Sequence, residues 1–384
     1  MNQTAWLLIS TTLLLLTLPG VALFYGGMVR KKNVLNTMAL PLLALVLASV
    51  EWPVLSEVLP IGLGVWTGNP AQEGQSPVLM HHSIACALAL ALVAGALVER
   101  MRIAFFLIFG LLWVAFVYST VVQWLWDGGW LTNLGALDFA GGAVIHISAG
   151  VTALALAVLV GPRQGYGRTE MMPNHLPLSF CGASFICVGW FGFSAGMGRA
   201  PITVATGAVV AIQVAAAAAA MAWTAAEWLQ RDKPTMLGSV SGAIAGLVAI
   251  SPAAGYVGPL SAMVIGSGAG VLCYMVVNFV KPILGYDDSL DVFGMHGVGG
   301  TWGMIATGLF ASTAVNPEGS DGLFYGYPYQ FAAQLAAVLG VWIFVGTATV
   351  LLFKGLESVL SPRVDEESEI VGLDLTQHGE RAYQ

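Results

Sequence analysis

Long apolar runs dominate this chain and limit the folds open to it more narrowly than any other feature. Of 384 residues, 57% are hydrophobic and only 9% are charged, whereas soluble domains carry roughly 25% charged residues. Many runs reach the length of about 20 residues that a membrane-spanning helix needs. They do not alternate in polarity over about 10 residues, as the strands of a transmembrane β-barrel do. The sequence therefore predicts an all-α integral membrane protein.

Breaks at charged residues and at proline and glycine clusters divide the chain into eleven predicted spans. These run near residues 5–29, 34–57, 79–98, 103–126, 138–161, 176–197, 202–229, 236–254, 259–280, 289–312 and 329–358. The first run is too long for a signal-peptide core and has no basic segment before it, so we interpret it as a span. The six alanines Ala215–Ala220 suit the close helix packing that small residues allow in membranes.

The basic residues indicate the orientation of these spans. In the eleven-span scheme, every lysine and arginine except Arg199 falls on one side of the membrane. Cytoplasmic segments are enriched in these residues, so we predict an N-terminus outside and a C-terminus inside. Eleven spans also divide into five, five and one, and two consecutive five-span halves must be inverted relative to each other, as in many transporters.

Each predicted half ends in a span that carries an acid and then a histidine. Asp138 precedes His146 in the fifth span, and Asp291 precedes His296 in the tenth. Equivalent helices of an inverted repeat would bring the two rings together. An ionisable residue inside a membrane is expensive and indicates function. Two neutral imidazoles, each with one donor and one acceptor nitrogen, can share a proton and line a path for a small hydrogen-bonding molecule.

Other chemistry is poorly supported by the sequence. A zinc site needs three or four ligands, and neither histidine has another histidine, a cysteine or a carboxylate at helical spacing; the four cysteines lie in apolar runs. Nucleotide-binding and serine-hydrolase motifs are missing. We therefore expect no metal, no cofactor and no enzymatic activity. Asp138 is expected to cap its helix, and it can also add negative potential near an outer cation site.

Four segments resemble the ammonium transporter (Amt/Mep/Rh) family. They are "DFAGGAVIHISAG", "GWFGFSAG" (Gly189–Gly196), "DVFGMHGVGGTWG" and "LFYGGMVRKKN". The tail "EIVGLDLTQHGERAY" is similar to that of the bacterial Amt branch. The resemblance covers essentially the whole chain. It implies a homotrimer of eleven-helix protomers in the bacterial inner membrane, each with its own narrow hydrophobic pore.

The resemblance also implies a route and the residues along it. Ammonium would be recruited at an outer vestibule, pass stacked phenylalanine rings and lose a proton, after which ammonia and the proton would move along a twin-histidine pore. The matching positions are His146 and His296 for the twin histidines, Phe193 for the lower gate ring, Trp126 and Asp138 at the vestibule, and Trp190 near the pore.

The outer site departs from the family pattern. Met197 stands where a serine is usual, and His81 and Ala85 stand where vestibule and gate phenylalanines are usual. Glu51 is an unusual acid in the outer half of the second span. Three interpretations follow: drift in a tolerant vestibule, with His81 and His82 exposed at a loop end; recruitment rebuilt around Glu51 or His81; or a sensor with little flux. Space at Ala85 would also suit another small amine.

The chain is predicted to have two parts. Residues 1–360 would form the transporter domain and 361–384 a cytoplasmic regulatory tail. The resemblance implies that this tail docks on neighbouring protomers and that a PII-type signalling protein binds the cytoplasmic face. A nucleic-acid partner is not expected.

Overall fold

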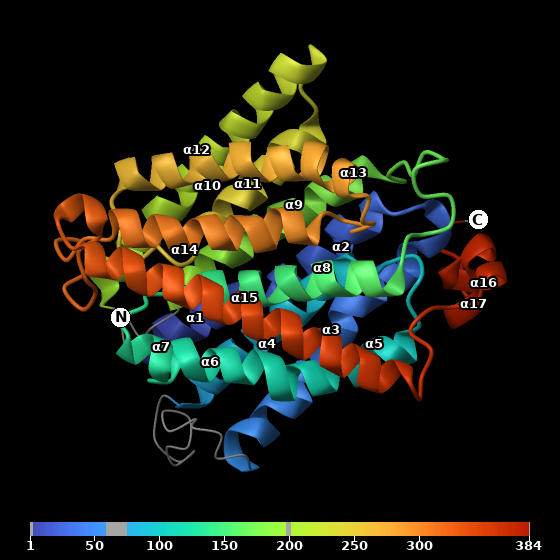
Figure 1. Ribbon diagram of the computed structural model, residues 1–384, viewed down its shortest axis with the longest axis horizontal. Coiled ribbons are helices and arrows are strands. Elements are labelled where there is room, and N and C mark those ends of the chain that lie inside the picture. Colours follow the sequence, from blue (N-terminus) through green and yellow to red (C-terminus); the bar gives the residue numbers. More distant parts are fainter. Residues whose placement is uncertain (1–2, 59–74, 197–200, 384) are drawn as a thin grey trace.

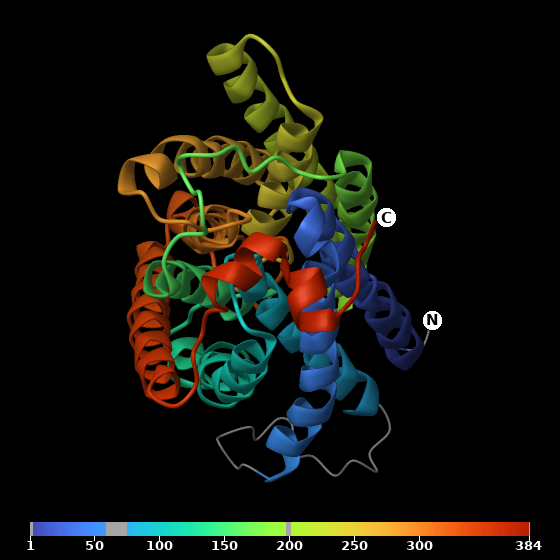
Figure 2. The same cartoon turned by 90° about the vertical axis from the view of Figure 1, so that its right-hand side faces the viewer.

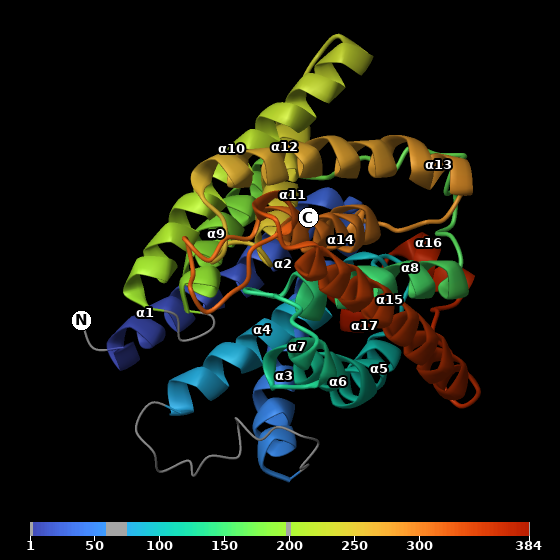
Figure 3. The same cartoon turned by 60° about the vertical axis from the view of Figure 1, so that its left-hand side comes forward.

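The computed structural model describes residues 3–58, 75–196 and 201–383, which form one bundle of helices (Figure 1). Most helices run along the long axis of the molecule, and the two ends of the chain lie at opposite ends of the bundle (Figure 1). We call these the N-terminal and the C-terminal end. The end of α10 and the start of α11 project away from the other helices (Figure 3).

The first half of the chain forms helices that lead up to His146. They are α1 (Gln3–Leu15), α2 (Thr17–Met28), η1 (Lys31–Asn33), α3 (Val34–Val58), α4 (Gln75–Gly95), α5 (Ile103–Trp113), η2 (Val114–Tyr118), α6 (Ser119–Trp126), α7 (Trp130–Asn133), η3 (Gly142–Ile147) and α8 (Ser148–Val160). Of these, α5, η2 and α6 are continuous, and so are η3 and α8.

The second half repeats this plan and is followed by a long helix and the two short helices of the tail. It contains α9 (Leu176–Gly196), α10 (Ile202–Arg231), α11 (Met236–Ile250), α12 (Pro259–Met275), η5 (Val276–Val280), α13 (Lys281–Leu284), η6 (Phe293–Gly297), α14 (Val298–Phe310) and η7 (Leu323–Tyr325). The long helix α15 (Pro328–Glu357) follows, and then the short helices α16 (Glu366–Val371) and α17 (Leu373–His378).

Within the described ranges, nine helices are long and apolar enough to cross a membrane. They are Thr4–Met28, Lys31–Ser56, Pro77–Gly95, Ile103–Asn133, Gly142–Val160, Leu176–Gly196, Ile202–Arg231, Pro259–Leu284 and Pro328–Glu357. The other two predicted spans, 236–254 and 289–312, are also helical. They form the shorter α11 and the continuous pair η6 and α14.

Wide π-helical turns occur at matching places in the two halves. The segment η2 lies within the long helix that precedes α8, and η5 lies within the long helix that precedes α14. The segments η3 and η6 begin the last helix of each half and contain His146 and His296. π-Helical turns are frequent at functional sites. Their repetition is what an internal duplication would produce.

Glycines allow the last helices of the two halves to touch through their backbones. A Cβ atom on Gly150 would lie 2.2 Å from the Gly297 nitrogen, and one on Gly300 would lie 2.6 Å from the Gly142 carbonyl oxygen. Each of Gly150 and Gly300 follows its histidine by four residues, one helical turn. Any side chain at these crossing points would force the helices apart, because real Cβ atoms do not approach backbone so closely.

An aspartate caps each of these two helices. The Asp138 carboxylate accepts hydrogen bonds from the backbone nitrogens of Gly142, Ala143 and Val144 at 2.6, 2.8 and 3.0 Å, as predicted. In the second half the cap is Asp288, which accepts from the Phe293 nitrogen at 2.7 Å. Our expectation that Asp291 matches Asp138 is wrong.

The spacing explains this correction. Asp138 and Asp288 each precede their histidine by eight residues (146 − 138 and 296 − 288). Asp291 instead pairs with Lys281 at 2.6 Å. The internal repeat is therefore more regular than the sequence alone indicated.

Buried charges tie the loops together at the C-terminal end of the bundle. The Arg163 guanidinium donates to Glu99 at 2.9 Å and to both Asp287 oxygens at 2.8 and 2.9 Å. Burial would raise the pKa of Glu99, but Arg163 and Arg30 hold it below its ordinary value of 4.5. Burial would likewise raise the pKa of Asp287, but hydrogen bonds from Arg163 hold it below 3.8. Arg163 thus bonds to both halves of the chain.

The tail docks on the same end of its own chain (Figure 2). The Asp374 carboxylate accepts from the Asn36 backbone nitrogen at 2.8 Å, and the Leu373 nitrogen donates to the Asn33 side chain at 2.9 Å. Lys32 donates to the Glu369 carbonyl oxygen at 2.9 Å. These contacts lie within one protomer, and docking on neighbouring protomers stays a prediction from the family resemblance.

We predict that Arg163→Met strongly destabilises the fold. Removing one partner of a buried ion pair typically costs about 3–5 kcal/mol, because the other charge stays buried and unpaired. Thermal unfolding in detergent should show a clear fall in the midpoint. Lys354→Met is the control, because Lys354 forms an exposed pair with Glu357 and exposed pairs contribute only about 0–1 kcal/mol.

The difference between wild type and Arg163→Met should depend on pH. Both carboxyl pKa values are lowered, so the contribution is complete above the ordinary values of 4.5 and 3.8 and is lost as the pH falls through the lowered ones. A difference that stays constant on acidification would contradict this assignment.

Candidate functional site

The histidines of the two halves meet inside the bundle. Nδ1 of His146 lies 3.2 Å from Nδ1 of His296, and the ring centroids are 5.2 Å apart with the planes 24° from parallel. His146 is fully buried and His296 is 5% exposed. At this distance one imidazole donates an N–H to the lone pair of the other, so the pair shares a single proton between the two Nδ1 atoms. Nε2 of His146 is buried without a hydrogen bond among the described residues.

A tryptophan continues this pair toward the N-terminal end. The ring of Trp190 on α9 stacks on His146, with the ring centroids 5.2 Å apart and 9° from parallel. Its indole N–H donates to the Ser251 hydroxyl at 3.1 Å, and Ser251 in turn donates to the Leu247 carbonyl oxygen. The second half of the chain therefore fixes the orientation of the ring that covers His146.

The next rings are Phe193 and His81. Phe193 meets Trp190 edge to face, at 6.2 Å and 88°. On its other side it stacks on the imidazole of His81, with the centroids 6.1 Å apart and 16° from parallel. Ala85 is also buried, one turn further along α4, but it carries no ring. The ring opposite Phe193 is thus an imidazole from His81.

The line of rings ends at a tryptophan that lies beside the cap of η3. The His82 ring lies 6.1 Å from that of His81 and meets Trp126 edge to face at 5.2 Å. The Trp126 indole N–H donates to the Asp138 carbonyl oxygen at 2.8 Å. The Trp126 side chain is therefore joined to the Asp138 backbone, and the vestibule role of both residues stays a prediction. The interpretation that His81 and His82 are exposed is wrong, because they are 1% and 8% exposed.

The two other candidates are Glu51 and Met197. Glu51 is half-buried on α3, and its Oε2 has no hydrogen-bond partner among the described residues. Met197 lies outside the residues that the structure describes. Among those residues, no three histidine, cysteine, aspartate or glutamate side chains gather as a metal site would require.

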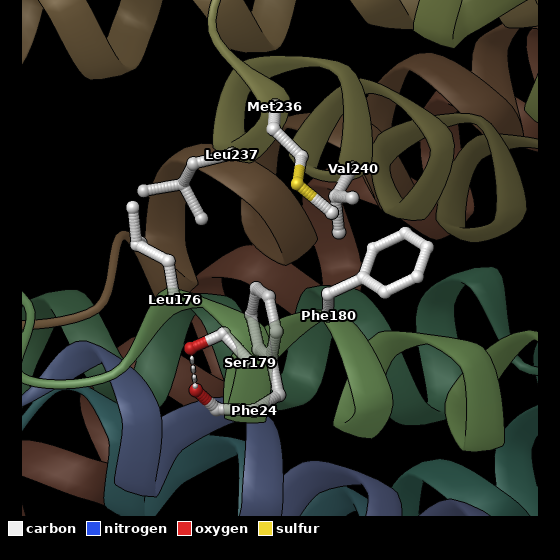
Figure 4. Close-up of a pocket in the computed structure, with 7 residues that line it drawn as sticks. All are labelled: Phe24, Leu176, Ser179, Phe180, Met236, Leu237 and Val240. Atoms are coloured by element: carbon white, nitrogen blue, oxygen red, sulfur yellow. Dashed lines mark hydrogen bonds between the residues drawn. The ribbon is translucent and has the colours of Figure 1, made fainter.

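A small pocket elsewhere in the fold is apolar and separate from the rings (Figure 4). It lies between α9, α11 and the end of α2, and its lining includes Phe24, Leu176, Phe180 and Met236. The one polar side chain shown, Ser179, donates to the Phe24 carbonyl oxygen at 3.0 Å and so points no free group into the space.

Sequence reasoning missed several supporting residues. Thr11, Ser251 and Gly196 position His81 or Trp190, yet each is an ordinary small residue in an apolar run and gives no signal of its own. Asp288 carried a detectable signal, because its spacing to His296 equals that of Asp138 to His146.

The apolar helices and the histidine pair at their crossing define a multi-pass membrane protein. The model of the Ammonium Transporter Family matches residues 5–383. The chain therefore belongs to the ammonium transporter family.

Individual relatives agree over the full length of the chain. An ammonium transporter of Bacillus subtilis is 43% identical over 100% of this chain and 99% of its own length. Ammonium transporter Amt1 of Archaeoglobus fulgidus is 41% identical over 100% and 99%. The crystal structure of Candida albicans Mep2 superposes with a TM-score of 0.87 at 30% identity, covering 99% of this chain and 90% of that one.

We predict that Gly150→Ala separates the two histidines. The new Cβ would lie 2.2 Å from the Gly297 backbone, which cannot yield as a flexible side chain would. Lower thermal stability and loss of ammonium transport should result together. Gly207→Ala in α10 is the matched control, because a Cβ there meets nothing within 4 Å. Wild-type transport by the Gly150→Ala protein would contradict the crossing as the element that sets the pair.

Proposed function

We propose that this protein transports ammonium by deprotonating it and conducting ammonia past paired histidines. The observation that carries the proposal is the buried His146–His296 contact beneath Trp190. Taking a cation out of water costs several kcal/mol per ion. A neutral ammonia molecule avoids this cost, and the shared imidazole nitrogens offer it both a donor and an acceptor.

The outer rings would recruit the cation in this mechanism. Trp126 offers an aromatic face that can attract a cation by about 0.5–2 kcal/mol. The Asp138 carboxylate accepts three backbone hydrogen bonds and adds negative potential below the tryptophan. Phe193 then separates the outer imidazole from Trp190 and the inner pair. Glu51, Met197 and the ring-free position Ala85 complete the proposed vestibule and gate.

Potassium would be excluded on chemical grounds. Potassium carries the same charge as ammonium but has no proton to give up. It would therefore have to pass the aromatic rings as an ion. Ammonia and its proton would travel separately through the bundle. Selectivity would follow from this separation.

The wider organisation is part of the same proposal. We assign eleven spans in an inverted five-plus-five arrangement with α15 as the last, the N-terminus outside and the C-terminus inside. Arg30, Lys32, Arg100 and Arg163 gather at the C-terminal end with the docked tail, which supports that end as the cytoplasmic one. We further propose a homotrimer in the bacterial inner membrane, with residues 1–360 as the transporter domain and 361–384 as a regulatory tail that binds a PII-type protein.

Currents from reconstituted protein test the transport mechanism directly. Ammonium pulses should give a saturable current with the wild type that potassium does not compete away. His146→Ala and His296→Ala should each abolish it, because one imidazole alone cannot share a proton. His175→Ala is the control, since His175 is exposed in a loop. Full ammonium-specific current from either pore variant would refute the mechanism.

Deletion of residues 361–384 tests the tail. It should leave membrane insertion and the thermal stability of the bundle largely intact, because the tail contacts only the C-terminal end. It should abolish binding of a PII-type signalling trimer, measured by co-purification. Unchanged binding would remove the tail from the regulatory site.

A further inference from the structure

His81 sits in a pocket built to hold an imidazole. Phe193 stacks on its face. A Cβ atom on Gly196 would lie 2.6 Å from its Cε1 atom, so only glycine leaves room for the ring there. Thr11 on α1 contacts its edge, with Oγ1 3.1 Å from Nδ1. Three helices, α1, α4 and α9, therefore position this one side chain.

The hydrogen bonds of Thr11 fix which ring nitrogen carries the proton. The Thr11 hydroxyl lies 2.7 Å from the Leu7 carbonyl oxygen and donates its only proton there. It can then only accept from His81, so Nδ1 must carry the hydrogen. In a neutral imidazole the other nitrogen is an acceptor. Nε2 of His81 is thus a lone-pair acceptor.

This acceptor has no hydrogen-bond partner in the described part of the chain. His81 is 1% exposed, and its Nε2 is buried without a hydrogen bond among the described residues. An unpaired buried acceptor is costly in a native structure, and a bound water, ion or ligand can satisfy it. The ring lies between Phe193 and the vestibule side chains His82 and Trp126. A ligand that reaches Nε2 of His81 would be a small hydrogen-bond donor on its way through the gate.

We propose that Nε2 of His81 is the hydrogen-bond acceptor that binds the ammonium ion at the gate, with Thr11 holding the ring in the accepting tautomer. The inference rests on the proposed transport function and adds a defined atom to it. A directional acceptor favours a cation that carries N–H groups over potassium. The Phe193 ring carries no nitrogen or oxygen, so of the two stacked rings only the imidazole supplies an acceptor.

Acid should oppose this binding. Protonation turns Nε2 into a donor, which cannot accept a hydrogen bond from the ammonium ion. α1 and α9 carry no charged side chain in their described residues. The other titratable groups on α4 are His82 and Cys86. The elements packed against α4 carry Tyr25 (α2), Glu51 (α3), Tyr118 (η2), His146 (η3) and Cys181 and Cys187 (α9).

Four proteins distinguish the effect of the hydrogen-bond acceptor from the effect of the stacked ring. They are wild type, His81→Phe, His81→Gln and Thr11→Val. His81→Phe keeps a stacked ring without an acceptor, and the apparent KM for ammonium should rise about tenfold or more, the value of a charge-assisted hydrogen bond. His81→Gln keeps an acceptor that does not titrate, so its KM should stay close to that of the wild type. Thr11→Val frees the tautomer and should give an intermediate KM.

Two readouts keep the inference distinct from the transport mechanism. Ammonium-pulse currents give KM against pH: the wild-type KM should rise on external acidification relative to that of His81→Gln. Stabilisation by ammonium chloride over potassium chloride in a thermal melt reports binding without flux. It should be present in the wild type and His81→Gln and lost in His81→Phe.

The outcomes are separable. The role of His81 would be overturned if His81→Phe kept the wild-type KM and pH profile, or if Thr11→Val had the same KM as the wild type. Either result would leave the transport mechanism standing. A wild type without current but with ammonium-specific stabilisation that His81→Phe lacks would overturn the transport proposal and support the binding site. If His81→Phe fails to fold, judged by its melt without ammonium, Thr11→Val and His81→Gln still decide the question.

Discussion

The contact between two glycine-bearing helices is the constraint on which the rest of the site depends. Gly150 and Gly297, and likewise Gly142 and Gly300, let backbones of the two halves touch without side chains between them. In a membrane, where lipid is as apolar as leucine, such close packing is a main source of helix association. The same contact places His146 and His296 within hydrogen-bond distance. The helix contact that stabilises the bundle is therefore also the contact that positions the two histidines.

Much of this organisation could be predicted from the sequence, and the reasons for the exceptions are physical. Apolar runs predict membrane helices because nothing else satisfies the backbone in lipid, and nine such helices are present in the described residues. α11 is too short to count as a membrane-spanning helix by length. The pairing of His146 with His296 was predictable from two ionisable groups in matching helices. The wrong match of Asp291 arose because capping depends on where a helix begins, and sequence patterns place helix ends poorly.

The ring that lies opposite Phe193 could not be identified by counting positions along the sequence. Counting along α4 puts a phenylalanine-type gate position at the small residue Ala85, which leaves space there. In the folded chain the ring of His81 fills the place opposite Phe193 instead. Its supporting residue, Thr11, is 70 positions away in sequence, so no local pattern could reveal it. The partner of the Phe193 ring is thus a polar aromatic ring.

The central claim is that His146 and His296 share one proton directly between their Nδ1 atoms, and nitrogen-15 NMR of protein with labelled histidines in lipid tests it most directly. The account predicts one protonated and one bare Nδ1, coupled across the hydrogen bond, with the coupled signals lost in either single variant. Two Nδ1 signals without coupling, or both protonated and bonded to other groups, would contradict the account.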